Sequence, residues 1–211
     1  MIVVPRTVSE KDSYRLLIGT LLPRPIAWVS SMNRAGNLNL APFSYFTVAS
    51  NRPMTLLFCP QPLSEAGEKK DTLRNVEEVP EFVINLANEE TAEAMNRSST
   101  PLPPGHSEFE WAGVTPAPSV TIRVPRVLEA PVSFECTLQQ IVKAGDTPGA
   151  GSVVFGEVQC IHMRDDIYVN GYVRLDALKP IARLAGISYT RITETFDMAR
   201  PPLPDELRHD I

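Results

Sequence analysis

Short runs of β-branched and aromatic residues, each closed by proline, glycine or asparagine, recur through most of this chain. The two longest runs, residues 132–142 and 152–163, flank a turn-forming sequence at residues 146–151, and this pattern is typical of a hairpin. Runs this short and regular favour an antiparallel barrel or sandwich over alternating strands and helices. We therefore predict a mainly β fold. The other expected strands are residues 26–30, 43–49, 54–59, 81–86 and 167–169.

Few segments carry helical signals. Ser9 is a suitable N-cap for the first of them, and Pro80 is expected to stop the second. The expected helices are residues 10–18, a segment that starts at Asp71 or Thr72, residues 89–95, and residues 176–184 with a break at Pro180. Since the chain shows neither a repeat nor an interdomain linker, we expect one domain over residues 1–211, with a proline-rich tail at 199–211.

Composition and charge exclude several classes of protein. Hydrophobic residues make up 43% of the chain and charged residues 21%, which argues against a disordered protein. The net charge of -5 disfavours a general affinity for nucleic acid. No apolar run reaches the roughly 18 residues that a membrane-spanning helix needs, and the first residues lack the basic and apolar segments of a signal peptide. We expect a cytoplasmic protein that binds neither nucleic acid nor membrane.

The cysteines and histidines give no sign of a metal or redox site. Cys59, Cys136 and Cys160 are widely spaced, so neither a redox CxxC motif nor a zinc knuckle is available. Cys136 and Cys160 lie in expected strands, where a free cysteine is usually a small buried hydrophobe. The three histidines are far apart in the sequence, without neighbours at ligand spacing. We therefore expect no metal-binding residues.

Two segments concentrate residues suited to ligand binding. Residues 23–31, Pro-Arg-Pro-Ile-Ala-Trp-Val-Ser-Ser, hold the chain extended before a strand and end in two hydroxyls. Residues 39–46, Asn-Leu-Ala-Pro-Phe-Ser-Tyr-Phe, enter the next strand through a proline and small polar residues. Taken alone, either segment could equally be ordinary barrel sequence, because short motifs are weakly specific.

A third segment, Lys69-Lys70-Asp71-Thr72, stands at a predicted helix start. Free N–H groups and the positive end of the helix dipole favour an anion at such a position. Lys70 adds a point charge and Thr72 adds a hydroxyl donor, a combination that suits a phosphate monoester. The alternative is a capped surface helix with solvated lysines, since Asp and Thr caps are common.

Taken in this order, the three segments resemble the flavin reductase-like family of FMN-binding split-barrel proteins. That family is characterised by a PRPIAWVS-type strand, an N-L-A-P-[FY]-S-[FY]-F segment and a K-D-T sequence at a helix start. Asn75, residues 81–86 and 133–136, and residues 180–184 with Tyr189 are further similarities, so the resemblance covers roughly residues 10–198. Ala185 departs from the pattern, because many members carry a second glycine before Gly186.

The resemblance implies an antiparallel Greek-key split barrel with a few peripheral helices. It also implies a homodimer that binds one FMN per subunit near the dimer interface. The implied cofactor-binding residues are Trp28, Val29, Ser30 and Ser31 beside the isoalloxazine and ribityl chain, Asn39, Ala41, Pro42 and Ser44 on its other side, Lys70, Asp71 and Thr72 at the phosphate, and Arg183 and Tyr189 near the flavin or nicotinamide.

The implied activity is that of an NAD(P)H-dependent flavin reductase, an oxidoreductase that passes hydride from NADH or NADPH to FMN and on to a small acceptor or a partner oxygenase. Such chemistry resides in the flavin, so no catalytic side chain is required. No GxGxxG sequence follows a strand, so the nicotinamide would dock over the flavin without a Rossmann domain. Two alternatives are an FMN-binding electron carrier or redox sensor without direct nicotinamide use, and a split-barrel interaction protein that has lost its cofactor.

Residues 98–118 carry five prolines and little periodicity. Loops of this length in compact domains are usually functional or disordered. The segment could be a lid over the nicotinamide face, an arm around the second subunit or a locally packed loop. Phe109 and Trp111 favour the arm, because large apolar side chains anchor interfaces.

Overall fold

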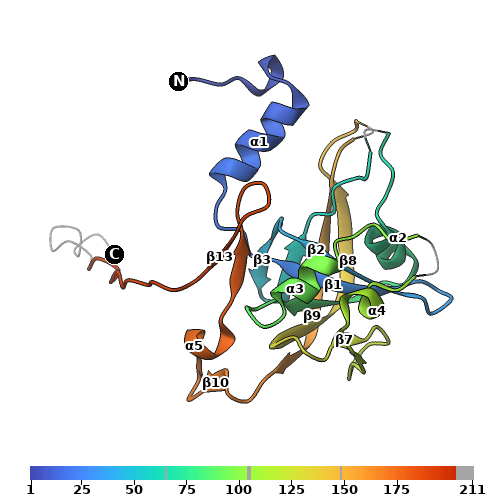
Figure 1. Ribbon diagram of the computed structural model, residues 1–211, viewed down its shortest axis with the longest axis vertical. Helices are drawn as coiled ribbons and strands as arrows, with labels where there is room; N and C mark the ends of the chain where they lie inside the picture. The colour runs from blue at the N-terminus through green and yellow to red at the C-terminus, as the bar shows by residue number, and fades with distance from the viewer. Residues whose placement is uncertain (65, 104–105, 148, 203–211) are drawn as a thin grey trace.

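The computed structural model describes residues 1–64, 66–103, 106–147 and 149–202. Its body is a seven-stranded sheet (Figure 1). Every neighbouring pair of strands in this sheet is antiparallel. The strand order is β2-β1-β5-β8-β9-β4-β3. These strands are β1 (Ala27–Met32), β2 (Leu38–Phe43), β3 (Phe46–Asn51), β4 (Met54–Phe58), β5 (Glu81–Leu86), β8 (Val132–Lys143) and β9 (Ser152–Met163).

Helices and short strands surround this sheet. The helical elements are η1 (Pro5–Thr7), α1 (Glu10–Thr20), α2 (Asp71–Glu78), α3 (Ala92–Arg97), α4 (Glu108–Ala112) and α5 (Leu175–Leu178). The short strands form three pairs, β6 (Pro116–Ala117) with β7 (Arg126–Val127), β10 (Tyr168–Val169) with β11 (Tyr172–Val173), and β12 (Ile181–Arg183) with β13 (Tyr189–Arg191). Helix α1 and the segment after β13 project away from the sheet (Figure 1). None of the helices in the described ranges is both long and apolar enough to cross a membrane.

The sheet curls into a barrel that is split at one corner. Its two edge strands, β2 and β3, are consecutive in the chain and are joined only by Ser44 and Tyr45. Phe43, on one edge, packs its ring 5.1 Å from the ring of Phe58 on β4, beside the other edge. The Phe58 ring in turn lies 5.5 Å from that of Phe82 on β5. Both ends of the strand order therefore face one core, which confirms the mainly β, antiparallel split-barrel prediction.

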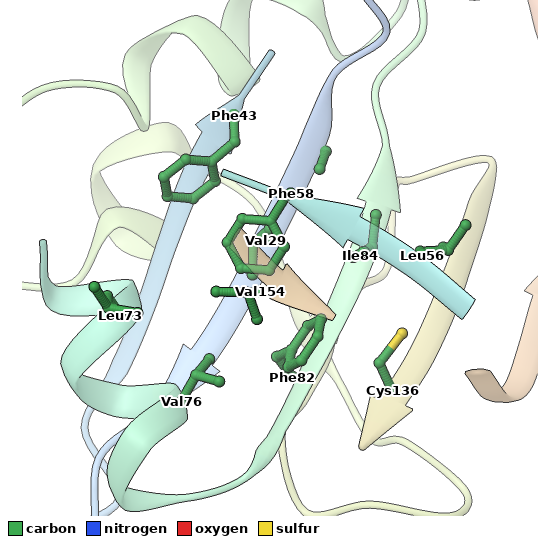
Figure 2. Packing of buried hydrophobic residues seen from close by; sticks show 11 residues of the cluster. Val29, Phe43, Leu56, Phe58, Leu73, Val76, Phe82, Ile84, Cys136 and Val154 are labelled. Carbon is green, nitrogen blue, oxygen red and sulfur yellow. The ribbon is translucent and has the colours of Figure 1, made fainter. Parts of the chain in front are cut away.

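Two hydrophobic clusters explain why β1 is buried on both faces. The first fills the barrel and includes Val29, Phe58 and Val154 (Figure 2). The second, which includes Trp28 and Phe109, lies outside the barrel and is closed by α3 and α4. Because successive side chains of a strand point to opposite faces, Val29 enters the barrel and Trp28 enters the outer cluster. The consecutive apolar residues Ala27, Trp28 and Val29 are expected in a strand covered on both sides.

The first two predicted helices are confirmed. The Ser9 side chain accepts a hydrogen bond from the backbone N–H of Asp12, so it caps α1 as expected. Helix α2 starts at Asp71 and ends before Pro80. Strands β5 and β9 have the predicted bounds, and β8 extends one residue further, to Lys143.

Three predicted segments differ from the structure. The run at 43–49 is divided between β2 and β3, because the chain turns the barrel corner at Ser44 and Tyr45. The helix predicted at 89–95 is observed three residues later, as α3. The helix predicted at 176–184 is wrong beyond α5, because Lys179 adopts a left-handed φ of 47° and Ile181–Arg183 pairs with β13. Proline at 180 also removes the N–H that a continuing helix would use.

The proline-rich segment at 98–118 contains more structure than predicted. It includes α4 and β6, while Pro104 and Gly105 lie outside the described residues. Phe109 is buried in the outer cluster of its own chain, whereas the Trp111 side chain is exposed. Of the two expected interface anchors, Phe109 is therefore a local packing residue. The predicted tail at 199–211 is described only as far as residue 202.

Candidate functional site

A cleft of about 390 Å³ opens at the split corner of the barrel. We call it the corner cleft. Its volume falls within the range of about 300–1,000 Å³ that is usual for small-molecule sites. Its walls come from the β2–β3 corner, the C-terminal turn of α1, the start of α2 and the β12–β13 hairpin. The residues that line it are Tyr14, Ile18, Arg24, Ile26, Pro42, Phe43, Ser44, Tyr45, Cys59, Gln61, Lys70, Met95, Ser99, Arg183, Leu184, Gly186 and Tyr189.

The charged side chains of the corner cleft are all cations. Arg24, Lys70 and Arg183 line it, and within the described part of the chain no carboxylate does. Burial raises the pKa of the Cys59 thiol. Burial and the nearby Tyr14 also raise the pKa of the Tyr45 hydroxyl, although Arg24 acts in the opposite direction. Both groups are therefore neutral at neutral pH, and the cleft keeps a positive character that favours an anionic ligand.

The surroundings of Lys70 suit an anionic ligand. Lys70 is the N-cap residue of α2, and its side chain makes no capping hydrogen bond. In the described ranges, the N–H groups of Asp71 and Thr72 find no acceptor, so the helix start offers donors beside the Lys70 ammonium. The Lys70 Nζ lies 5.8 Å from the centroid of the Phe43 ring, within reach of a cation–π interaction. The Phe43 ring and the Lys70 ammonium therefore lie side by side in the corner cleft.

The residues around Lys70 are already paired. Lys69 Nζ lies 2.7 Å from a carboxylate oxygen of Glu77. Asp71 is exposed and forms an ion pair with Arg74. Within the described residues, Lys70 has no carboxylate within 4 Å, so its charge is available to a ligand. Asp71 is therefore not among the residues that line the cleft.

Arg24 builds the floor of the cleft and was not among the predicted binding residues. Its guanidinium donates to the carbonyls of Ile18 and Leu21 at the end of α1, at 2.8 and 2.9 Å, and to the carbonyl of Leu184 at 2.9 Å. Its Nε donates to Ser44 Oγ at 3.3 Å. One buried cation therefore holds α1, the barrel corner and the β12–β13 hairpin together. The adjacent Pro23 and Pro25 drew attention to this segment, but two of the Arg24 partners, Ser44 and Leu184, lie 20 and 160 residues away and could not be identified from the sequence.

Arg183 and Tyr189 form the opposite wall, across from the barrel corner. The Arg183 guanidinium lies 4.5 Å from the centroid of the Tyr189 ring and donates to the Tyr189 hydroxyl and to the carbonyl of Gly186. The Tyr189 hydroxyl also donates to Asn96 Oδ1 at 3.2 Å. These contacts fix a planar, cationic surface on the β12–β13 hairpin, of the kind that can stack on or pair with a flat anionic ligand.

The structure brings five of the predicted cofactor-binding residues to the corner cleft: Pro42, Ser44, Lys70, Arg183 and Tyr189. Ala41 is half-buried against the barrel core, on the strand that leads to the corner. The other predicted residues, apart from the exposed Asp71, have buried side chains behind the cleft. They are Trp28, Val29, Ser30, Ser31, Asn39 and Thr72. Their contact with a ligand stays a prediction.

The buried polar residues behind the cleft form a network that positions α2. Asn39 Nδ2 donates to Thr72 Oγ1 at 2.9 Å, and Asn75 Nδ2 donates to Ser31 Oγ at 3.1 Å. These bonds join β1 and β2 to α2, the helix that follows Lys70. Trp28 Nε1 donates to Ser98 Oγ at 2.8 Å and so points away from this network. The hydroxyls and amides of both sequence motifs thus orient the anion-binding corner from behind.

An aromatic ligand with an anionic group fits these features. The walls offer Phe43, Tyr45 and Tyr189, and Lys70 with the α2 start offers a phosphate-binding end. In the described part of the cleft there is neither a histidine nor a carboxylate that could act as a general base. The arrangement can bind and orient such a ligand, and the reaction would have to come from the ligand's own chemistry.

Comparisons with known proteins agree on one family. A family model described as the flavin reductase like domain matches residues 19–176. An uncharacterised protein of Halalkalibacterium halodurans is 40% identical over 201 residues, which are 94% of this chain and 96% of that protein. The crystal structure of nitrilotriacetate monooxygenase component B from Bacillus cereus is 38% identical, with a TM-score of 0.90 over 94% of this chain and 98% of that chain. The 2-nitrobenzoate 2-nitroreductase of Pseudomonas fluorescens is 32% identical, with a TM-score of 0.86 over 97% of this chain and 99% of that chain.

Proposed function

This chain belongs to the flavin reductase-like family of oxidoreductase enzymes, and from that premise we propose that it binds FMN in the corner cleft and reduces it with NADH or NADPH. The observation that carries this proposal is the charge and shape of the cleft. It joins three cations to aromatic walls, without a carboxylate among its described lining residues. A flat ring that carries a phosphate monoester is the ligand that uses both features.

In this proposal the chain supplies binding and orientation. Lys70 and the free N–H groups at the start of α2 hold the phosphate. Pro42 and Ser44 lie along the ring at the barrel corner, and Arg183 with Tyr189 covers the cleft from the hairpin side. When FMN is bound, its ring accepts the hydride. The nicotinamide would dock on the open side of the cleft, since no dinucleotide-binding motif is present in the sequence.

An anaerobic titration tests the activity. FMN is added to the purified protein, and NADH or NADPH is then added in steps while the visible flavin absorbance is recorded. Bleaching by at least one of them in stoichiometric amounts is expected. Bleaching by dithionite but by neither nicotinamide would instead identify an electron carrier or redox sensor. A protein without measurable FMN affinity would contradict flavin binding itself.

Two relatives suggest where the electrons go. The similarity to nitrilotriacetate monooxygenase component B supports delivery of reduced FMN to a partner oxygenase. The similarity to 2-nitrobenzoate 2-nitroreductase supports direct reduction of a small nitroaromatic acceptor. We propose the first role, because the corner cleft is open and would allow reduced flavin to leave. Reduced FMN that passes an ultrafiltration membrane under anaerobic conditions would support it. Retained flavin together with rapid oxidation by 2-nitrobenzoate would favour the second role.

We also propose that residues 1–211 act as one domain in a cytoplasmic homodimer with FMN near the interface. The support for a dimer is the apolar surface of α1, of the β10–β11 hairpin and of the segment after β13, which includes Leu17, Tyr172 and Phe196. These segments lie beside or beyond the hairpin that closes the corner cleft (Figure 1). A second subunit on this side would therefore contact the cleft walls.

A further inference from the structure

A second cluster of reactive side chains lies away from the corner cleft, where β8 and β9 pair. Glu135 on β8 is the direct cross-strand partner of Cys160 on β9, and His162 follows Cys160 two residues later. Residues two apart on a strand point to the same face, so the three side chains project together. Glu135 comes from a different strand than Cys160 and His162, so the sequence does not show that the three side chains lie together. None of the three lines the cleft.

The ligand atoms of this cluster are close enough to share one metal ion. Glu135 Oε1 lies 2.5 Å from His162 Nε2, and Cys160 Sγ lies 4.0 Å from the same nitrogen. All three atoms lie within 4.8 Å of one another. Around a tetrahedral Zn²⁺ with normal bond lengths, the N···O separation is about 3.3 Å and the S···N separation is about 3.6 Å. Shifts of less than about 1 Å in side chains on neighbouring strands would produce that geometry.

Glu135 is held as a one-oxygen ligand. Its Oε1 accepts from the backbone N–H of Val120 at 2.7 Å, and its Oε2 accepts from the N–H of Thr121 at 2.7 Å and from the Thr121 hydroxyl. The remaining lone pair of Oε1 is directed at His162. A metal ion in the place of the imidazole proton would use that lone pair and leave the other three hydrogen bonds intact. Such outer contacts are the usual means of fixing a metal-binding carboxylate.

The cluster is also accessible. Cys160 and His162 are half-buried, whereas the Glu135 side chain is fully buried, so an ion could enter from the His162 side.

We propose that Glu135, Cys160 and His162 bind one thiophilic divalent cation of the Zn²⁺ class. The ligands are one carboxylate oxygen, one thiolate and one imidazole nitrogen, with a water molecule completing the tetrahedron. Binding releases the thiol proton of Cys160 and the Nε2 proton of His162. This site differs from the sequence-based expectation of no metal ligand. Its chemistry is structural, since it would tie the loop at Val120 and Thr121 to β8 and β9.

Cobalt substitution tests the site directly. The flavin-loaded protein is treated with a chelator, dialysed and titrated with Co²⁺, and difference spectra are recorded against the same protein without metal. One equivalent per chain is expected to produce a sulfur-to-cobalt charge-transfer band in the near ultraviolet and the intense visible bands of a tetrahedral site. Added Zn²⁺ should abolish both sets of bands. Zn²⁺ should also raise the thermal unfolding midpoint of the wild-type protein.

Two conservative variants and one matched control make the result specific. Cys160→Ser is expected to lose the charge-transfer band, and His162→Gln is expected to weaken Co²⁺ binding at least 10-fold. Cys59→Ser, which changes a thiol outside the cluster, is expected to retain the full spectrum. Absence of a charge-transfer band in the wild type would overturn the proposal. A spectrum that persists in Cys160→Ser, or that disappears in Cys59→Ser, would overturn it as well.

Discussion

Lys69 and Lys70 are adjacent in the chain and have different environments. Lys69 is paired with Glu77 on the surface, whereas Lys70 lines the corner cleft against Phe43. The sequence predicted a phosphate-binding role for Lys70, and the structure gives a reason why only one of the two lysines is available for it. Because of this difference, Lys69 can serve as the control when the role of Lys70 in phosphate binding is tested.

We predict that Lys70→Ala lowers FMN affinity by roughly 10- to 100-fold, because a hydrogen bond to a charged group contributes about 1.5–3 kcal/mol. Riboflavin, which lacks the phosphate, should bind almost equally well to the variant and to the wild type. Lys69→Ala should change neither affinity, since exposed ion pairs contribute little. Isothermal titration calorimetry with both flavins measures these effects. An equal loss for FMN and riboflavin would place the phosphate elsewhere.

Glu135 is a buried carboxylate whose pKa is strongly lowered in the folded protein. Its pKa, about 2, is lower than the ordinary value of 4.5 because its hydrogen-bond donors outweigh the effect of burial. A carboxyl group whose pKa is depressed by folding stabilises the native state above its unfolded pKa. That contribution is lost as the pH falls from about 4.5 towards 2.

We therefore predict that Glu135→Gln lowers the free energy of unfolding by roughly 2–3 kcal/mol at pH 7, the order of magnitude that such a pKa shift implies. The difference from wild type should stay constant down to about pH 5 and should narrow below pH 4.5, as the wild-type carboxyl becomes protonated. Urea unfolding in chelator at several pH values measures it. Glu93→Gln, at an exposed position, is the control. A difference that narrows between pH 7 and pH 5 would assign the effect to another group.

Strand β9 carries a glycine that the barrel requires. A Cβ atom at Gly156 would lie 2.3 Å from Phe82 Cζ and 3.1 Å from Cys136 Cβ, in the middle of the core. Neither neighbour is free to move, since both side chains are fully buried. The missing side chain at this position lets the Phe82 ring fill the barrel interior. The packing of β4, β5 and β8 against β9 depends on it.

Gly156→Ala is predicted to cost about 1–3 kcal/mol of stability, or more if the Phe82 ring cannot shift, because overpacking forces strain into a filled core. The double variant Gly156→Ala with Phe82→Leu should recover part of this loss relative to the sum of the two single changes. Gly145→Ala is the control, since its Cβ would meet only Ala150 Cβ at 3.7 Å. Denaturant unfolding of the wild type and the four variants measures these losses. Additive losses would show that the contact with Phe82 is not the cause.

The strands were predictable where the pattern of apolar residues and the turn-forming residues that flank it indicate the same bounds. Strand β5 begins directly after Pro80 and β9 lies between Gly151 and Arg164, and both contain several β-branched residues. The short pair β12–β13 was missed because its three-residue strands resemble the end of a helix in sequence. The pairing of β12 with β13 decides between helix and strand, and Lys179, in the left-handed region, ends the helix before β12. Local signals alone cannot encode that choice.

The candidate site was predictable in part, for a related reason. Lys70 could be identified because it stands at a helix start, which has a local physical meaning. Ser44 was predicted only from the family resemblance. Arg24 was not predicted, because its partners Ser44 and Leu184 lie 20 and 160 residues away. The side chains of Trp28 to Ser31 are buried because β1 is covered on both faces, and that covering depends on α3 and α4. Long-range contacts therefore decide which motif residues reach the cleft.

Helix α1, the β10–β11 hairpin and the segment after β13 expose large apolar side chains. In the β10–β11 hairpin, Tyr168 and Tyr172 keep 57% and 78% of their surface exposed, and after β13 Phe196 keeps 84%. A two-stranded hairpin open to water on both faces is marginally stable by itself. Large contiguous apolar patches usually mark interaction surfaces. Arg24 connects one of these segments, α1, and the β12–β13 hairpin to the cleft floor.

If a second subunit covers these segments, dissociation should loosen the cleft walls and flavin affinity should depend on protein concentration. We predict a dimer in sedimentation velocity experiments, and a shift towards monomer in Tyr168→Ser with Tyr172→Ser, because each exposed aromatic ring contributes apolar area to the contact. Val48→Ser, at an exposed position on β3, is the matched control and should remain dimeric. The variant should bind FMN more weakly than the control at the same concentration, since Arg183 and Tyr189 lie on the hairpin that the partner would support. A wild-type protein that stays monomeric at all concentrations and binds FMN fully would refute the link between assembly and the site.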